Sequence, residues 1–170
     1  IESGGISALH MVEDEKLDIA LTNYESGFSN KLNYQKLFTC ECCFVTYPEH
    51  RLAGRESVSL EDFVDEPLVM LDSSFFVYHM VHDMFAKEGK KANIIHYSPY
   101  LHTIKTMVKS GIVSTFLTRQ AILPADNLVL IPLAEPFYIN SGIVTKKGRQ
   151  IYDDEKILMD YLQKITKSLK

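Results

Sequence analysis

The stretch PLVMLDSSFFVYHMVHDMFAKEGKKANIIHYSPYLHTIKTMVKSGIVSTFLT (67–118) contains three short apolar runs separated by two segments of helical periodicity. The runs at 67–71, 93–96 and 112–118 have the length of buried strands. Between them, apolar residues recur every three or four positions: Val77, Met80, Val81, Met84 and Phe85 in the first segment, and Leu101, Ile104, Met107 and Val108 in the second. Gly89 and Gly111 predict the two helix ends. Strands that alternate with helices predict a parallel sheet with helices on both faces.

The flanking segments extend this α/β pattern in both directions. Before the stretch, the sequence predicts a helix over 6–16, a strand over 17–22, a polar loop over 23–33, a strand over 38–46 and a short helix over 60–64 that begins with a capping box at Ser59–Asp62. After it, the sequence predicts strands over 127–133 and 137–145 and a helix over 153–169, with apolar positions Ile157, Leu158, Tyr161, Leu162, Ile165 and Leu169. Two long strands that bracket a compact block indicate two lobes, connected twice by the chain.

Composition and charge exclude several classes of function. The chain has 170 residues, 46% of them hydrophobic and 24% charged, as in a globular protein. A net charge of −4 with four arginines argues against DNA binding by these residues, because phosphate contacts need clustered lysine and arginine. No apolar run approaches the roughly 20 residues that span a bilayer. The start, Ile1–Gly5, lacks an initiator Met and the features of a signal peptide, so we interpret the chain as a fragment.

The cysteines and histidines provide weak evidence for a metal site. Cys40, Cys42 and Cys43 are an odd number in a short span, which argues against a disulfide framework and favours a reducing cytoplasm. We interpret them as small buried hydrophobic residues. His79 and His82 share a helix face but have no third ligand nearby, so we expect no metal. His96 and His102 flank the second predicted helix of the stretch, where they could sense pH or bind an acid.

Four segments together resemble one known family. KLDIALT (16–22), KLFTCECCFVTYPEHRLAGRESVSLEDFVDEPLVML (36–71), TMVKSGIVSTFLTRQAI (106–122) and LVLIPLAEPFYINSGIVTKK (128–147) are similar, in order, to the effector-binding (substrate-binding) domain of LysR-type transcriptional regulators. Two positions depart from the family pattern: Val113 stands where a glycine is usual, and Thr118 where a proline is usual. The resemblance also implies that the first strand and helix of the domain precede Ile1.

The resemblance implies a fold and a set of partners. The fold would be α/β, with two Rossmann-like lobes joined by two crossing strands, similar to type II periplasmic binding proteins. Lobe I would comprise 1–44 and 141–170, with its first strand and helix missing, and lobe II would comprise 45–140. A small-molecule effector would bind between the lobes and change how a homodimer or tetramer holds its DNA-binding domains. DNA would be bound only through the missing N-terminal domain, with no membrane partner and no cofactor.

The predicted effector site follows from the position of ligands in α/β sheets, at the carboxyl ends of strands where helices begin. These positions are Gly4, Gly5, Thr22, Ser73, Ser74, Phe76, Ser98, Tyr100 and Thr118. Helix N-termini present N–H groups and partial positive charge, which suit a carboxylate or another anion. Each residue also has a structural interpretation. Ser98 would be the N-cap of its helix, with Pro99 in the first turn; Ser73 and Ser74 would form a turn; Phe76 and Tyr100 would pack the lobe.

Two other functions remain open at this point. A solute-binding protein of a transporter would have the same architecture, although clustered cysteines argue against an oxidising periplasm. A small cytosolic enzyme on this fold is the second alternative. It is disfavoured because the chain contains no G-x-S-x-G elbow, no glycine-rich phosphate loop and no H-E-x-x-H motif. The sequence therefore predicts a cytoplasmic binding domain without catalytic residues.

Overall fold

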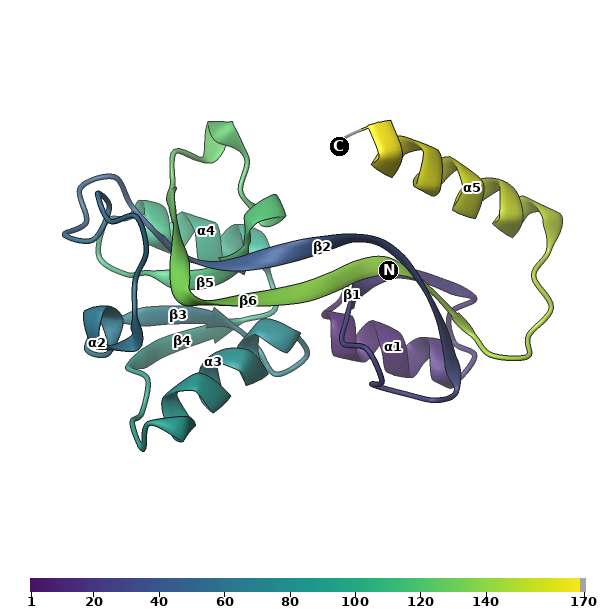
Figure 1. Ribbon diagram of the computed structural model, residues 1–170, viewed down its shortest axis with the longest axis horizontal. Coiled ribbons are helices and arrows are strands. Elements are labelled where there is room, and N and C mark those ends of the chain that lie inside the picture. Colours follow the sequence, from purple (N-terminus) through teal and green to yellow (C-terminus); the bar gives the residue numbers. More distant parts are fainter. Residues whose placement is uncertain (169–170) are drawn as a thin grey trace. The chain divides into compact units, whose positions relative to one another are not determined.

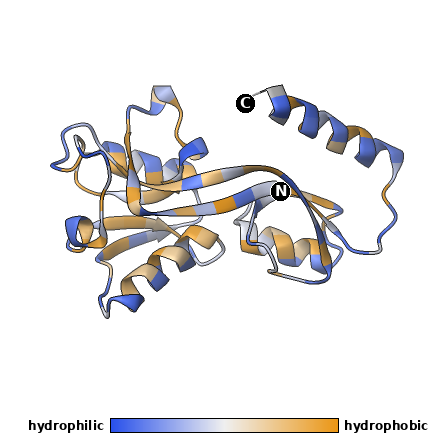
Figure 2. Cartoon of the chain, viewed as in Figure 1, coloured by the Kyte–Doolittle hydropathy of each residue, from blue (hydrophilic) through white to orange (hydrophobic). Residues whose placement is uncertain are grey.

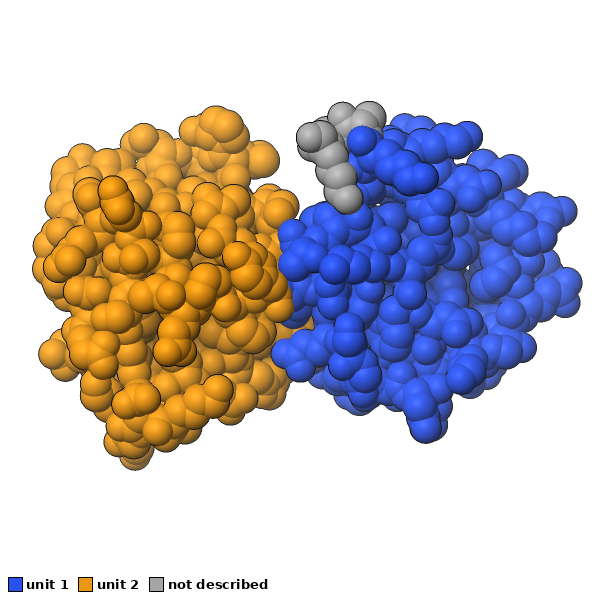
Figure 3. Space-filling model, in the orientation of Figure 1, with its two compact units in different colours: residues 1–39, 139–170 blue, residues 40–138 orange. Residues whose placement is uncertain are grey.

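A computed structural model describes residues 1–168 (Figure 1). The chain folds into two compact units (Figure 3). Unit 1 comprises Ile1–Thr39 and the described residues from Ile139 on, and unit 2 comprises Cys40–Tyr138. The chain passes between the units within two long strands, β2 (Leu32–Thr46) and β6 (Val129–Lys146). Helices and sheets are mixed throughout, which confirms the predicted α/β class.

Unit 2 contains the strand–helix–strand pattern that the sequence predicted. Its elements are α2 (Leu60–Phe63), β3 (Leu68–Leu71), α3 (Phe76–Lys87), β4 (Ile94–Ser98), α4 (Leu101–Lys109) and β5 (Thr115–Thr118). β3 pairs with β4 in parallel, and a parallel bridge joins Leu68 to Ser114, just before β5. The three strands therefore run in the same direction and end at the same edge.

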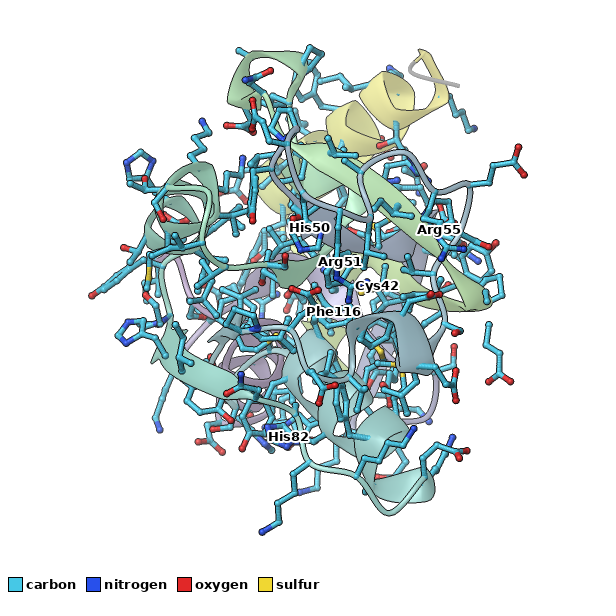
Figure 4. The ribbon with its side chains drawn as sticks, turned by 90° about the vertical axis from the view of Figure 1, so that its left-hand side faces the viewer. Cys42, His50, Arg51, Arg55, His82 and Phe116 are labelled. Atoms are coloured by element: carbon cyan, nitrogen blue, oxygen red, sulfur yellow. The ribbon has the colours of Figure 1, made fainter. Side chains whose placement is uncertain are left out.

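The two helical stripes of unit 2 pack on opposite sides of its strands. Val77, Val81 and Phe85 of α3 join a core with Cys42 and Phe116 (Figure 4), in which aromatic rings lie 5–6 Å apart and contribute large buried areas. The stripe of α4 faces a second core, with Ile104 and Val108 fully buried against β3 and β5 residues. This confirms the predicted placement of helices on both faces.

Unit 1 contains α1 (Gly5–Glu13), β1 (Ile19–Tyr24), parts of β2 and β6, and α5 (Asp153–Ser168). α1 buries Leu9 and Val12. β1 pairs with β6 in antiparallel register, from Ile19 opposite Thr145 to Tyr24 opposite Asn140. The main sheet has the order β1-β6-β2-β5, and the β2–β5 pair is also antiparallel. The predicted parallel pairing is found between β3 and β4 and at the Leu68–Ser114 bridge. The predicted helix position Leu169 lies outside the described residues.

Three predicted boundaries were wrong. The strands predicted over 127–133 and 137–145 form one continuous strand, β6. β2 begins at Leu32 rather than 38, within the expected polar loop, because a neighbouring strand pairs with it and overrides local propensity. Ser98 is the last residue of β4 and not an N-cap, since the N-cap of α4 is Tyr100 and the helix begins at Leu101.

Candidate functional site

The carboxyl ends of β3 and β4 lie side by side in unit 2 and carry most of the predicted effector residues. Leu71 and Ser98 are paired at the end of the β3–β4 ladder. Ser73, Ser74 and Phe76 follow directly after Leu71 at the start of α3, and Tyr100 follows Ser98 at the start of α4. Two helices thus follow the carboxyl ends of two paired parallel strands, which is where ligands bind in open α/β sheets.

Ser98 fixes the turn between β4 and α4. Its side chain is buried, with 4% of the residue exposed, and its Oγ accepts a hydrogen bond from the Tyr100 backbone N–H at 3.1 Å. Tyr100 itself is 69% exposed, so its ring does not pack the core as the structural interpretation proposed. Phe76, in contrast, is 5% exposed and belongs to the interior.

The loop after β3 is organised by a carboxylate. Asp72 Oδ1 accepts hydrogen bonds from the Ser74 backbone N–H at 3.0 Å and from the Ser74 hydroxyl at 2.6 Å. The Ser73 carbonyl oxygen lies 2.9 Å from His79 Nε2, which holds the other side of the loop. The turn predicted here is therefore present, and it places one negative charge, Asp72, at the edge where the strands end.

Neither helix at this edge has a side-chain cap on its N-terminus. The N-cap residues are Phe75 for α3 and Tyr100 for α4, and neither side chain caps its helix by a hydrogen bond. The first N–H groups of a helix have no acceptor within the helix, and together with the macrodipole they favour a negatively charged or hydrogen-bond-accepting group. The edge thus offers donors from α3 and α4 beside an acceptor, Asp72.

Thr118 ends β5, where it pairs with Cys42 and is half-buried. Next to it, Arg119 Nε donates to Glu41 Oε2 at 2.8 Å, so the positive charge of the guanidinium is balanced. The sequence does not predict this pair because its partners lie 78 residues apart. The strand pairing of β2 with β5 is the signal that brings them together.

The remaining predicted residues belong to unit 1. Gly4 and Gly5 are buried at the start of α1, where Gly4 is the N-cap, with extended backbone and no side-chain cap. Thr22 lies within β1, opposite Gly142 of β6, and is half-buried. The helix start at Gly5 agrees with the predicted entry loop, one residue before the expected position.

A cavity of about 310 Å³ also lies in unit 1, and none of the predicted residues lines it. It is bordered by Glu15, Leu17, Asp18 and residues 146–149. Two of the cations at its wall are ion-paired: Lys146 with Glu15, and Arg149 with Asp18 and Glu155. These pairs join the α1–β1 loop to the segment that leads into α5, so the cavity wall has a structural role.

The cysteines and histidines have ordinary structural environments. Cys40, Cys42 and Cys43 are buried thiols, as predicted, and burial raises the pKa of Cys40 and of Cys43 to about 11. His82 Nε2 lies 3.1 Å from the Tyr97 hydroxyl (His82 is labelled in Figure 4). Within residues 1–168, no group of three histidine, cysteine or acidic side chains could hold a metal ion. No helix in that range is long and apolar enough to cross a membrane.

Comparison with known proteins assigns the chain to a family. The profile described as LysR substrate binding domain matches residues 2–165. The chain is 22% identical over 169 residues to the malolactic fermentation system transcriptional activator of Lactococcus lactis, covering 96% of this chain and 57% of that protein. The chain therefore spans little more than half the length of this relative.

Two solved structures share the fold. The regulatory domain of Synechocystis CcmR, in complex with 2-PG, superposes with a TM-score of 0.85 at 17% identity, covering 96% of this chain and 80% of that one. The effector-binding domain of QuiR, in complex with shikimate, has a TM-score of 0.79 at 18% identity, covering 97% and 79% of the two chains. At these identities the likeness shows a shared fold.

Proposed function

The chain belongs to the LysR substrate-binding domain family, and from this premise we propose that it is the ligand-sensing regulatory domain of a LysR-type transcription regulator. It senses a small polar or anionic effector and carries no catalytic residues. DNA is bound by a separate domain outside these 170 residues, because this chain has a net charge of −4 and only four arginines.

The observation that carries the proposal is the pair of uncapped helix N-termini at the ends of β3 and β4. N–H groups of α3 and α4 suit the oxygen atoms of an anionic group, and Asp72 suits a hydroxyl donor. A small hydroxylated carboxylate or phosphate satisfies both. We therefore assign the effector contacts in unit 2 to Ser73, Ser74, Ser98, Tyr100, Thr118 and the backbone of Phe76. Gly4, Gly5 and Thr22 of unit 1 stay predictions from the sequence.

The proposed output is a change in assembly. An effector shifts a conformational equilibrium only by its difference in affinity between the two states. We propose that this shift rearranges a homodimer or tetramer of the regulator and so changes how the regulator binds DNA in the cytoplasm. The Lactococcus relative is named a transcriptional activator, which supports a regulatory role over transport or catalysis.

A thermal-shift screen tests the proposal. Shikimate and 2-PG, with a panel of other hydroxy acids, are added to the 170-residue chain, and the unfolding temperature Tm is measured. A ligand at roughly 100 times its Kd stabilises a protein by about 2.7 kcal/mol, which corresponds to a Tm rise of roughly 5–10 °C for a chain of this size.

Two matched variants locate the binding. Tyr100 and Ile112 are each 69% exposed; Tyr100 directly precedes α4, and Ile112 follows three residues after its end. Tyr100→Glu adds a carboxylate at the helix N-terminus and should weaken binding of an anionic ligand at least tenfold by charge repulsion, whereas Ile112→Glu should leave binding unchanged. Equal affinities of the two variants would place the effector elsewhere.

A further inference from the structure

We infer that Arg119 binds the anionic group of the effector and that Glu41 is a built-in competitor, a carboxylate that holds the guanidinium until the effector replaces it. This role rests on the proposed function, because it concerns the same edge of unit 2. It goes beyond that proposal by naming the cation of the site and the contact that the effector has to break.

Arg119 directly follows β5, at the edge where the parallel strands of unit 2 end. A parallel bridge joins Leu68 of β3 to Ser114, just before β5. Ser73 comes five positions after Leu68, and Arg119 comes five positions after Ser114. Because parallel strands advance equally per residue, this register brings Arg119 to the same edge as the loop that begins α3.

Glu41 and Arg119 lie on the side of the sheet that α4 covers. Cys43 and Leu117 pair across β2 and β5, and both belong to the core that Ile104 of α4 fills. Glu41 comes two residues before Cys43 on β2, so its side chain points to the same side. Since Arg119 bonds this carboxylate, its guanidinium lies on the side where the uncapped N-terminus of α4 presents N–H groups.

Charged side chains follow directly where two of the strands end. β3 is buried and hydrophobic along its whole length (Figure 2), and Asp72 comes immediately after it. Arg119 comes immediately after β5 in the same way. Asp72 is a hydrogen-bond acceptor for Ser74, so the positive charge that an anion needs at this edge comes from Arg119.

The Arg119–Glu41 contact does not use the geometry in which arginine binds anions best. Arg119 Nε and Nη2 both donate to one oxygen atom, Glu41 Oε2, and 46% of the Arg119 side chain is exposed. In contrast, Nη1 and Nη2 of Arg149 bond the two oxygens of Glu155, and 18% of that arginine is exposed. A carboxylate or phosphate that presents two oxygens can form this bidentate contact with Arg119.

Competition with Glu41 selects the effector by charge. A neutral ligand that displaced Glu41 would leave the guanidinium without a counter-charge, whereas an anion replaces one carboxylate by another negative group. The ion pair therefore disfavours neutral compounds at this edge and lowers the affinity for anions slightly, because breaking a partly exposed pair costs little.

Titration with inorganic phosphate tests the contact without a known effector. The ¹⁵N-labelled chain reports binding through the Arg119 Nε–H signal and through the amides of the first turn of α4. We expect both to shift with one Kd. Arg55 is the internal control, because its guanidinium is 60% exposed and pairs with Asp62 of α2, before β3 begins. Its Nε–H signal should require at least about tenfold more phosphate.

Substitutions separate the roles of the two partners. Arg119→Gln should weaken phosphate binding at α4 at least about tenfold, because the cation is lost. Glu41→Gln keeps the size of the side chain without its charge, and should strengthen binding roughly three- to fivefold. Arg55→Gln is the matched control and should leave the Kd unchanged. All three variants should keep the Tm of the wild type within about 3 °C.

Equal phosphate affinity in the wild type and in Arg119→Gln would overturn the inference. So would no gain in Glu41→Gln, or no saturable shift of the Arg119 signal. The proposed function has a separate outcome in the Tm screen. A compound that stabilises the wild type and Arg119→Gln alike would uphold the sensor and overturn only the role of Arg119. Phosphate binding at Arg119 without any stabilising compound in the panel would uphold the anion contact and contradict the sensor.

Discussion

Thr115 and Thr46 are both fully buried threonines of unit 2, with opposite hydrogen-bonding states. Among the described residues, the Thr115 hydroxyl is the buried side-chain group without a partner, whereas Thr46 Oγ1 accepts from the Ser114 hydroxyl at 2.9 Å. Thr115→Val should therefore raise the free energy of unfolding by about 1 kcal/mol, and Thr46→Val should lower it by about 1–2 kcal/mol. Urea denaturation measures both, and a loss of equal size in the two variants would contradict the assignment.

Gly142 is required where β6 passes β2. A Cβ at this position would lie 2.3 Å from the Gln35 backbone carbonyl oxygen, so one of the strands would have to move. Gly142→Ala should lower the free energy of unfolding by about 1–3 kcal/mol. Gly54→Ala is the control, because a Cβ there meets no atom within 4 Å. Denaturation midpoints measure the difference, and equal midpoints for the two variants would show that the strands are not this close.

The identity of a residue predicted its burial and backbone conformation better than it predicted its hydrogen-bond or ion-pair partner. The burial of Cys42 followed from interpreting the clustered cysteines as small hydrophobic residues, and the end of α4 followed from Gly111, whose φ of +79° suits glycine. The Arg119–Glu41 pair could not be predicted, since it exists only because β2 and β5 are paired. Ser98 was wrongly predicted as an N-cap because a serine side chain accepts local backbone N–H groups in turns as well as at helix starts, and here it accepts that of Tyr100.

At the scale of elements, α4 is tied to the loop after β5 by one carboxylate. Asp126 lies 2.7 Å from Lys105 Nζ and 3.2 Å from Lys109 Nζ, and it also accepts the Leu123 backbone N–H. The hydrogen bond from Lys105 is the largest of the causes that hold the pKa of Asp126 well below its ordinary value of 3.8.

The pH dependence of this contact has a definite sign. Because the pKa is lower in the folded state than in the unfolded one, the stabilisation is complete above about pH 4 and is lost as the pH falls below it. Asp126→Asn should therefore have a lower Tm than the wild type from pH 7 to pH 5, with the gap closing below about pH 4. Asp65→Asn, at an exposed aspartate, is the control. A gap that is constant down to pH 3 would contradict the ion pairing.

Helices were predicted more accurately than strands, for a physical reason. The stripes of α3 and α4 arise from local spacing, whereas strand ends depend on neighbours. β6 continues through Pro132 and Pro136. On one side of this stretch lies an isolated bridge to Val58, whose N–H donates to the Pro132 carbonyl oxygen and whose carbonyl oxygen accepts the Ala134 N–H. The nitrogens of the two prolines face this same side. A proline on that side removes no regular ladder hydrogen bond, so the predicted break does not occur.

At the scale of the whole molecule, the order of apolar segments predicted the α/β class and the chain's two passages between units. The candidate site was predictable as a set of strand ends, because the direction of β3 and β4 follows from the helix between them. The charge of the site could not be predicted, because neither Asp72 nor Arg119 is among the residues that the sequence indicates as effector contacts. The effector proposal therefore depends on the structure for the side-by-side ends of β3 and β4 and for the contact of Asp72 with Ser74.

Amide chemical-shift mapping tests the central claim most directly. ¹⁵N-labelled chain is titrated with the compound that raises Tm most in the screen, and shift changes are followed residue by residue. We predict the largest changes at Ser73, Ser74 and the first turns of α3 and α4, with saturation at a single Kd. The largest changes at the unit 1 cavity around Glu15 and Arg149, or no saturable change with any compound of the panel, would contradict the account.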